Sequence, residues 1–249
     1  MTNPSGHIDQ SLAFVDPQLT NTADEPGKES RPAMNGEVHG EGGGSQGERF
    51  WEEHYRASTR ASNGKPSGAL VRFAGPLPGG TALDLGCAQG DDAVWLAKRG
   101  WRVVAVDVSG TVLARAAKNA QTAGVSNLIE FQRHDLASTF PEGRFDLVSA
   151  LFLHSPVEFP RTQVLRAAAR AVAPGGLLLI VEHASAAPWS WAEPHTAFPT
   201  PEQSLAALDL DPSRWRGEFV GAPERVATGP GGQRATVTDN VIAVRRLAP

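Results

Sequence analysis

The chain has 249 residues, of which 41% are hydrophobic and 20% charged, a balance typical of a globular protein with a sizeable buried core. Its net charge of -4 gives no electrostatic reason to expect nucleic acid or an anionic membrane as a partner, and no run approaches the ~18 apolar residues that a membrane span needs. The single cysteine, Cys87, excludes an intrachain disulfide, and together with the lack of a signal peptide it predicts a cytoplasmic protein.

Residues 1–47 differ in composition from the rest of the chain. Pro, Gly, Ser, Asn and acidic residues dominate, and the segment ends in a glycine-rich run at 40–47. Such a segment buries too little apolar surface to offset the entropy lost on ordering, so we predict a disordered tail over 1–47 and a folded domain over 48–249. The short apolar cluster at residues 12–15 is either a docking segment or part of a solvated tail.

The predicted domain begins with two short helices. Residues 48–57 carry aromatic side chains at helical spacing, and residues 69–73 form a second helix after a break rich in Gly and Pro. A Gly/Pro turn at 75–80 then leads into the first strand.

Strands and helices alternate regularly from residue 81. We expect strands at 81–85, 102–107, 129–133, 145–151 and 177–182, with helices at 91–99, 112–124 and 161–172. The second and fifth strands are near-continuous apolar runs, as expected for strands that are buried on both faces. The pattern predicts a doubly wound α/β fold with a mostly parallel, seven-stranded sheet.

The alternation stops after the fifth strand. A segment rich in aromatic residues, Pro and His spans 188–201, and a further helix is expected at 204–210. Two β-like runs, 218–228 and 235–245, flank a glycine-rich turn, so we predict a C-terminal antiparallel hairpin that closes the edge of the sheet.

Three acidic residues stand at the carboxyl ends of the first three predicted strands, namely Asp84, Asp107 and Asp135. In an open parallel sheet the ligand crevice lies outside those ends. Gly86 and Gly90 allow the backbone to approach a ligand closely, and Asp107 is well placed to accept hydrogen bonds from two ribose hydroxyls. The constellation therefore predicts a nucleotide site.

The charge around the glycine turn selects among nucleotides. A dinucleotide fingerprint would offer uncharged residues to a diphosphate, whereas here Asp84 precedes the turn and Asp91 and Asp92 follow it. Carboxylates repel a diphosphate but attract the ammonium and sulfonium groups of S-adenosylmethionine. The acids thus favour S-adenosylmethionine over NAD.

Five motifs along the chain resemble, in order, those of the class I S-adenosylmethionine-dependent methyltransferases. They are residues 82–90 (ALDLGCAQG), 104–109 (VAVDVS), 134–136 (HDL), 145–148 (FDLV) and 172–177 (VAPGGL). The resemblance spans Trp51 to Arg246 and implies that family's Rossmann-like fold. It departs from the pattern at Ala88, where the family usually has glycine.

The resemblance also implies which residues contact the cofactor. They are Trp51, Tyr55, Asp84, Gly86, Cys87, Gly90, Asp107, Val108, Asp135, Leu136 and Leu151. Residues 50–55 (FWEEHY) and 95–101 (WLAKRGW) are similar to the thiopurine and tellurite-resistance branch, whose small-molecule enzymes place an aromatic N-terminal helix over the cofactor. Trp51 and Tyr55 would then be lid residues; the alternative is that they pack in the core.

The candidate catalytic residues are His154, after the fourth strand, and His183, which follows Glu182 at the end of the fifth. Either imidazole could act as a general base, which a protonated nucleophile needs and a thiolate or telluride does not. The alternative is a histidine that only orients a loop. No ligand spacing predicts a metal site.

Other conspicuous side chains receive simpler interpretations. Cys87 is expected to pack rather than to react, because it lies inside the cofactor turn. Arg161, Arg166 and Arg170 recur at about one helical turn and are expected to form a solvated face. The aromatic segment is either a lid over the acceptor or a loop that covers the sheet edge; its side chains are Trp189, Trp191, His195 and Phe198.

The expected function is methyl transfer to a small-molecule acceptor through O, N, S or a chalcogen. The sequence names neither the acceptor nor the oligomeric state. Two alternatives remain: a protein that binds S-adenosylmethionine without catalysis, and an NAD-dependent oxidoreductase, which the acids around the turn disfavour.

Overall fold

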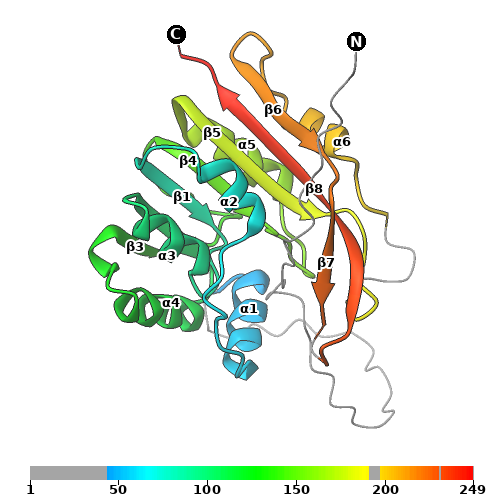
Figure 1. Ribbon diagram of the computed structural model, residues 1–249. Helices are drawn as coiled ribbons and strands as arrows, with labels where there is room; N and C mark the ends of the chain where they lie inside the picture. The colour runs from blue at the N-terminus through cyan, green and yellow to red at the C-terminus, as the bar shows by residue number, and fades with distance from the viewer. Residues whose placement is uncertain (1–43, 191–196, 230, 249) are drawn as a thin grey trace, which may run out of the picture.

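The computed structural model describes residues 44–190, 197–229 and 231–248 (Figure 1). The helices are α1 (Gln46–Ala57), α2 (Gly68–Ala74), α3 (Asp91–Lys98), α4 (Gly110–Thr122), η1 (Ser126–Leu128), α5 (Arg161–Ala171) and α6 (Pro201–Ala207). The strands are β1 (Thr81–Leu85), β2 (Arg102–Asp107), β3 (Ile129–Arg133), β4 (Phe145–Leu151), β5 (Val172–His183), β6 (Trp215–Gly221), β7 (Glu224–Thr228) and β8 (Arg234–Arg246).

One sheet runs through the described part of the chain, in the order β3-β2-β1-β4-β5-β8-β6, with β7 paired to β8. The first five strands are parallel to one another, and β8 joins β5 antiparallel. The order reverses between β1 and β4, so the ligand crevice of a doubly wound fold is expected outside the carboxyl ends of these two strands. Figure 1 shows α1 and β7 at the end of the sheet towards which the parallel strands point.

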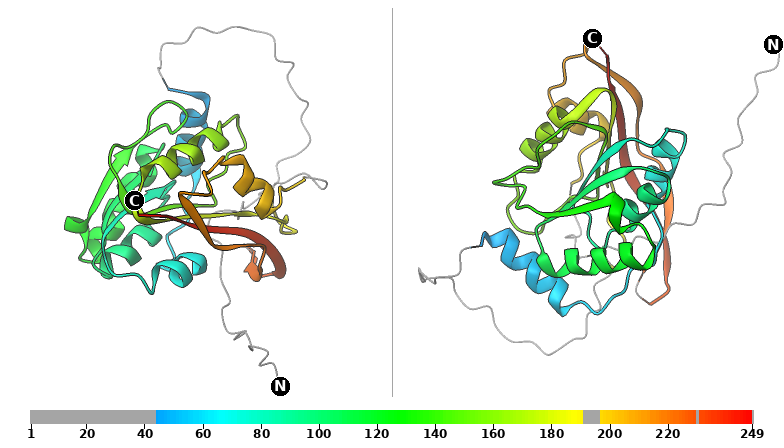
Figure 2. Two further views of the ribbon diagram at one scale, coloured as in Figure 1. Left: turned by 90° about the horizontal axis from the view of Figure 1, so that it is seen from above. Right: turned by 90° about the vertical axis from the view of Figure 1, so that its left-hand side faces the viewer.

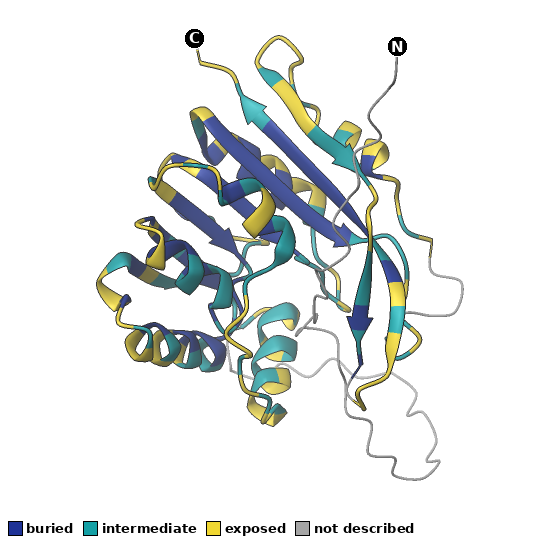
Figure 3. Ribbon diagram, viewed as in Figure 1, coloured by how far each residue is buried: buried dark blue, intermediate teal, exposed yellow. Residues whose placement is uncertain are grey.

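Figure 2 shows from two directions that helices cover both faces of the sheet. Alternate residues of the central strands belong to two separate buried clusters. One buried cluster joins the strands to α2, α3 and α4, and the other joins them to α5 and to Leu208 after α6. The central strands are dark blue along most of their length in Figure 3. Burial on both faces explains their continuous apolar sequence. The doubly wound prediction is confirmed.

The C-terminal part differs from the prediction in two details. We predicted one strand over 218–228, but the structure divides this run into β6 and β7 at Ala222-Pro223. Proline has no N–H to donate to the ladder, so pairing is interrupted there. The described sheet thus has eight strands rather than the predicted seven. The predicted hairpin is present as β7 and β8, but β8 lies between β5 and β6 instead of at the edge. The same strand therefore completes the core and reaches the carboxyl end of β5.

Some predictions fall outside the described residues. These include most of the predicted tail, of which only 44–47 are described, where Ser45 is the N-cap of α1. Trp191 and His195 also lie outside. None of the helices described is long and apolar enough to cross a membrane.

Candidate functional site

The turn after β1 is built from left-handed backbone. Gly86, Ala88 and Gly90 have φ angles of 74°, 45° and 79°. The N–H groups of Gly86 and Cys87 both donate to the carbonyl of Val106 on β2, at 2.9 Å. This conformation suits glycine, and alanine is the smallest side chain that tolerates it, so Ala88 keeps the family's turn at a modest cost in strain.

Asp107 ends β2 beside this turn and is almost fully buried. Its carboxylate accepts hydrogen bonds from the N–H of Ala88 and the N–H of Ser109, both at 3.1 Å. Burial nevertheless raises the pKa of Asp107 to about 6. The carboxylate is thus held rigidly at the crevice in a poorly solvated position, which favours a ligand that adds donors.

Asp84 and Asp92 form a second pair of acids in the crevice. Ser149 donates to Oδ1 of Asp84 at 3.0 Å, whereas Oδ2 of Asp84 is buried with no hydrogen-bond partner among the described residues. Burial raises the pKa of Asp84 to about 6, and burial together with the charge of Asp84 raises the pKa of Asp92 to about 8. Such an acid cluster gains free energy when a cation approaches it.

Helix α1 packs against the start of α4, next to the carboxyl end of β2. Glu52 accepts hydrogen bonds from the hydroxyl of Ser109 at 2.7 Å and from the hydroxyl of Thr111 at 2.5 Å, which caps the N-terminus of α4. These bonds lower the pKa of Glu52 to about 2. Trp51 and Tyr55 are half-buried on the same helix with ring centres 5.9 Å apart, and burial and the charge of Asp107 raise the pKa of Tyr55. Of the two predicted lid residues, Tyr55 therefore lies near Asp107, and Trp51 packs beside Tyr55.

The other predicted cofactor residues line the same edge of the sheet. Asp135 follows β3 and its Oδ1 accepts the N–H of Ala137 at 3.0 Å, while half-buried Leu136 packs against the sheet. Val108 is half-buried after β2, and Leu151 is buried at the end of β4. Cys87 is buried in the turn, and burial raises the pKa of its thiol, which agrees with a packing role.

The segment after β4 borders the crevice on the side of β5. A Cβ added to Gly86 would lie 2.8 Å from Cδ1 of Leu153, so the two segments touch. Phe152 has a φ of 56°, a left-handed conformation that is strained for a bulky residue and that frequently marks a functional site. In this backbone conformation the ring of Phe152 stacks on the ring of His183, with 4.6 Å between the ring centres.

The two predicted catalytic histidines come together here. The rings of His154 and His183 stack with centres 5.4 Å apart. Nδ1 of His183 lies 3.5 Å from a carboxylate oxygen of Asp239, a buried residue of β8 that also pairs with Arg225. Burial, with a contribution from the positive charge of Arg161, lowers the pKa of His154 to about 3, so His154 is neutral at physiological pH.

The solvated face predicted for three arginines is wrong for Arg161. Arg166 and Arg170 are exposed, but Nη1 of Arg161 lies 2.7 Å from Oε2 of Glu182, whose side chain is 1% exposed. Arg161 is the first residue of α5, and its ion pair with Glu182 places its guanidinium at the end of β5. Helical spacing alone did not reveal that orientation.

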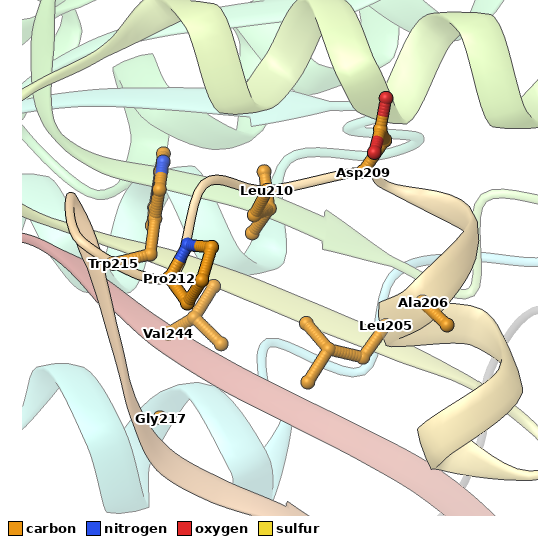
Figure 4. Close-up of a pocket in the computed structure, with 8 residues that line it drawn as sticks. All are labelled: Leu205, Ala206, Asp209, Leu210, Pro212, Trp215, Gly217 and Val244. Atoms are coloured by element: carbon orange, nitrogen blue, oxygen red, sulfur yellow. The ribbon is translucent and has the colours of Figure 1, made fainter.

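Two described members of the aromatic segment lie away from the acid cluster. Trp189 is half-buried, and its ring would lie 2.7 Å from a Cβ added to Gly229 at the end of β7. Phe198 is half-buried just before α6. A separate hollow of about 290 Å³ lies between α6, β6 and β8, with Leu205, Leu210 and Trp215 in its walls (Figure 4). Its walls hold none of the predicted site residues.

Comparison with known proteins identifies the crevice. Residues 82–176 match a family model described as a methyltransferase domain, and this range contains the turn, Asp107, Asp135 and His154. The matched segment is a methyltransferase domain. The motif resemblance is therefore confirmed.

Individual relatives match parts of this chain. A probable thiol methyltransferase 2 of Arabidopsis thaliana is 33% identical over 101 residues, 39% of this chain and 45% of the relative. A 2-heptyl-1-hydroxyquinolin-4(1H)-one methyltransferase of Mycobacteroides abscessus is 30% identical over 157 residues, 62% of this chain and 66% of the relative. The chain spans about half the length of the first curated relatives that it matches.

Solved structures support the fold. The structure of TehB from Haemophilus influenzae superposes with a TM-score of 0.59 at 18% identity, covering 80% of this chain and 66% of that protein. At this identity the likeness concerns the fold alone.

The cofactor of the methyltransferases that this domain resembles is S-adenosyl-L-methionine, and the residues at the carboxyl ends of the strands fit its charges. The unpartnered Oδ2 of Asp84 and the acid cluster around it suit a ligand that carries an ammonium and a sulfonium group. Arg60, which the sequence did not single out, has a buried Nη1 with no partner among the described residues, while its carbonyl accepts a hydrogen bond from Gln89 in the turn. A guanidinium there suits the cofactor's carboxylate.

Proposed function

We propose that this chain transfers the methyl group of S-adenosylmethionine to a small-molecule acceptor in the cytoplasm. The observation that carries the proposal is the buried carboxylate cluster at the switch point of the sheet, with Asp84 left unpartnered. The acceptor would enter on the side of β5, where His154, His183 and Phe152 form a wall of stacked rings. A wall of this kind suits a small planar acceptor.

When bound, S-adenosylmethionine supplies a methyl group on a positively charged sulfur. The residues of this chain that match the family's motifs would hold the cofactor. Asp107 would accept the ribose hydroxyls, Asp84 would attract the ammonium, and Asp135 with Leu136 would contact the adenine. The side chains on α1, Trp51 and Tyr55, would exclude water from the crevice.

The two histidines would have different roles on the acceptor side. A base with a pKa of about 3 takes up protons poorly at neutral pH, so His154 suits a neutral hydrogen-bonding role better than that of a base. His183 is oriented by Asp239, which would stabilise the imidazolium formed when His183 accepts a proton from the nucleophile. We therefore prefer His183 as general base.

The relatives widen the range of acceptors to be tested. One is named as a thiol methyltransferase and another acts, by its name, on a hydroxyquinolinone. A thiolate needs no base, whereas a hydroxyl does. The pairing of His183 with Asp239 favours a hydroxyl acceptor for this chain.

Calorimetry with S-adenosylmethionine tests the cofactor half of the proposal. We expect tight binding by the wild type and at least tenfold weaker binding by D84N and D107N, because each loses a negative charge in a poorly solvated site. D211N is the matched control, since Asp211 is an exposed acid on a loop. Binding of NAD instead of S-adenosylmethionine would contradict the assignment.

A methylation assay tests the acceptor half. Phenols, thiols, selenite and tellurite are incubated with S-adenosylmethionine labelled in its methyl group, and wild type is compared with H154A and H183A. We expect H183A to lose turnover of hydroxyl acceptors. Tight cofactor binding without transfer to any acceptor would favour a binding protein without catalysis, and full activity of H183A would remove that residue from the chemistry.

A further inference from the structure

Two buried nitrogens on the acceptor side have no hydrogen-bond partner among the residues that the structure describes. They are Nε2 of His154 and Nη2 of Arg161. An unsatisfied buried polar group destabilises the folded chain, so two of them on neighbouring residues indicate a ligand that completes their hydrogen bonds. Neither is explained by cofactor binding, because both lie beyond β4 on the side of β5.

The two residues are connected through Leu153. Nε of Arg161 donates to the carbonyl of Leu153, the residue before His154, at 2.9 Å. Leu153 in turn lies against Gly86 in the cofactor turn. An oxygen bound by Arg161 and His154 would therefore lie next to the place where the methyl group is offered.

Glu182 fixes the orientation and the charge of the Arg161 side chain. Its Oε2 faces Nη1 of Arg161 at 2.7 Å, and its Oε1 accepts hydrogen bonds from Ser204 and, at 3.1 Å, from Asn240. With Glu182 ionised, the buried pair carries no net charge. Nη2 of Arg161 is then a strong donor without excess positive charge, which suits a neutral oxygen better than an anion.

We propose that Arg161 and His154 recognise the methyl acceptor through a neutral carbonyl group and an adjacent hydroxyl. Nη2 of Arg161 donates to the carbonyl oxygen, and Nε2 of His154 pairs with the hydroxyl. The stacked rings of Phe152, His183 and His154 add a preference for a planar skeleton. This inference rests on the proposed methyl transfer and narrows its acceptors to planar hydroxy-carbonyl compounds.

Binding of two matched probes tests the role of Arg161. Calorimetry on protein saturated with S-adenosylhomocysteine compares 2-hydroxyacetophenone with 2-ethylphenol, which has the same ring and hydroxyl but no carbonyl. We expect wild type to prefer the ketone at least tenfold, since one hydrogen bond from a charged donor accounts for a factor of about 10–100. R161M should bind both probes alike, and R161K should retain part of the preference.

Arg166 supplies the matched control on the same helix. It is exposed and donates only to the carbonyl of Ala207 in the contacts described, so R166M should keep the wild-type preference. A parallel loss in R166M would mean that the helix, not the Arg161 guanidinium, is responsible.

E182Q separates a positioning role from a merely structural one. The amide keeps the size of the side chain but leaves the guanidinium charge uncancelled. We expect E182Q to gain affinity for salicylate, the anionic analogue, relative to 2-hydroxyacetophenone, with unchanged affinity for S-adenosylhomocysteine. Simple loosening of the fold would weaken both probes together and leave their ratio unchanged.

The outcomes are distinct. Equal binding of the two first probes by wild type, binding of neither, or a preserved preference in R161M would overturn the inference. Failure of the protein to bind S-adenosylhomocysteine would instead overturn the proposed function.

Discussion

The close contact between Gly86 and Leu153 yields a prediction whose size follows from the geometry. In G86A the new methyl group must occupy a φ of 74°, which costs an L-residue about 1–2 kcal/mol, partly offset by about 0.4–1 kcal/mol because alanine restricts the unfolded chain. It also meets Cδ1 of Leu153 at 2.8 Å, and displacing that partly buried side chain adds roughly 1 kcal/mol. We expect G86A to lower the free energy of unfolding by about 2 kcal/mol.

G100A is the matched control for backbone strain alone. Gly100 has a φ of 85°, but a Cβ added there meets nothing within 4 Å. We therefore expect G100A to cost about 1 kcal/mol less than G86A in urea denaturation. The double variant G86A/L153A should recover that difference as a coupling energy, because the obstructing methyl is gone. Equal losses in G86A and G100A, or additive losses in the double variant, would refute this reasoning.

Three further predictions concern the crevice. A88G relieves a left-handed alanine, so its free energy of unfolding in urea should equal that of wild type or exceed it by up to ~1 kcal/mol; a clear loss would show that the methyl group packs productively. E52A removes the cap that α1 places on α4, so it should cost about 1 kcal/mol and speed S-adenosylmethionine release in stopped-flow measurements, whereas an unchanged release rate would exclude α1 as a lid. Asp84 and Asp107 have pKa values raised to about 6, so lowering the pH from 7 to 5 protonates them in the free protein and removes their attraction for a cation. The affinity for S-adenosylmethionine, measured by calorimetry, should therefore be about tenfold weaker at pH 5 than at pH 7. An affinity that does not change with pH would contradict this role of the two acids.

The parallel half of the sheet was predictable because its strands are sharply bounded. The predicted bounds of β1, β2, β3 and β4 agree with the structure. The apolar runs of the first three strands end at a glycine or a charged residue, which marks their limits. The boundary between β6 and β7 was missed although Pro223 marks it. The side chains of β6 and β7 are largely exposed or half-buried, so the hydrophobic pattern did not mark where one strand ends and the next begins.

The grouping of the predicted cofactor residues at one edge of the sheet followed from the sequence to the same degree, whereas the contacts of the two histidines did not. Asp84, Asp107 and Asp135 lie at strand ends, which a topological rule brings together. Asp239 reaches His183 only through the register of β8 on β5, which depends on long-range pairing that local patterns do not determine. The left-handed backbone of Phe152 and the inward orientation of Arg161 depend likewise on tertiary contacts.

The interior position of β8 bears on the order in which the molecule matures during synthesis. The segments from α1 to β4 that surround the cofactor leave the ribosome first, and they can assemble as a parallel α/β unit while the remainder is being made. Glu182 and His183, by contrast, acquire their partners Asn240 and Asp239 only after β8 has inserted between β5 and β6. A nascent chain would thus gain the capacity to hold the methyl donor before it could select a recipient.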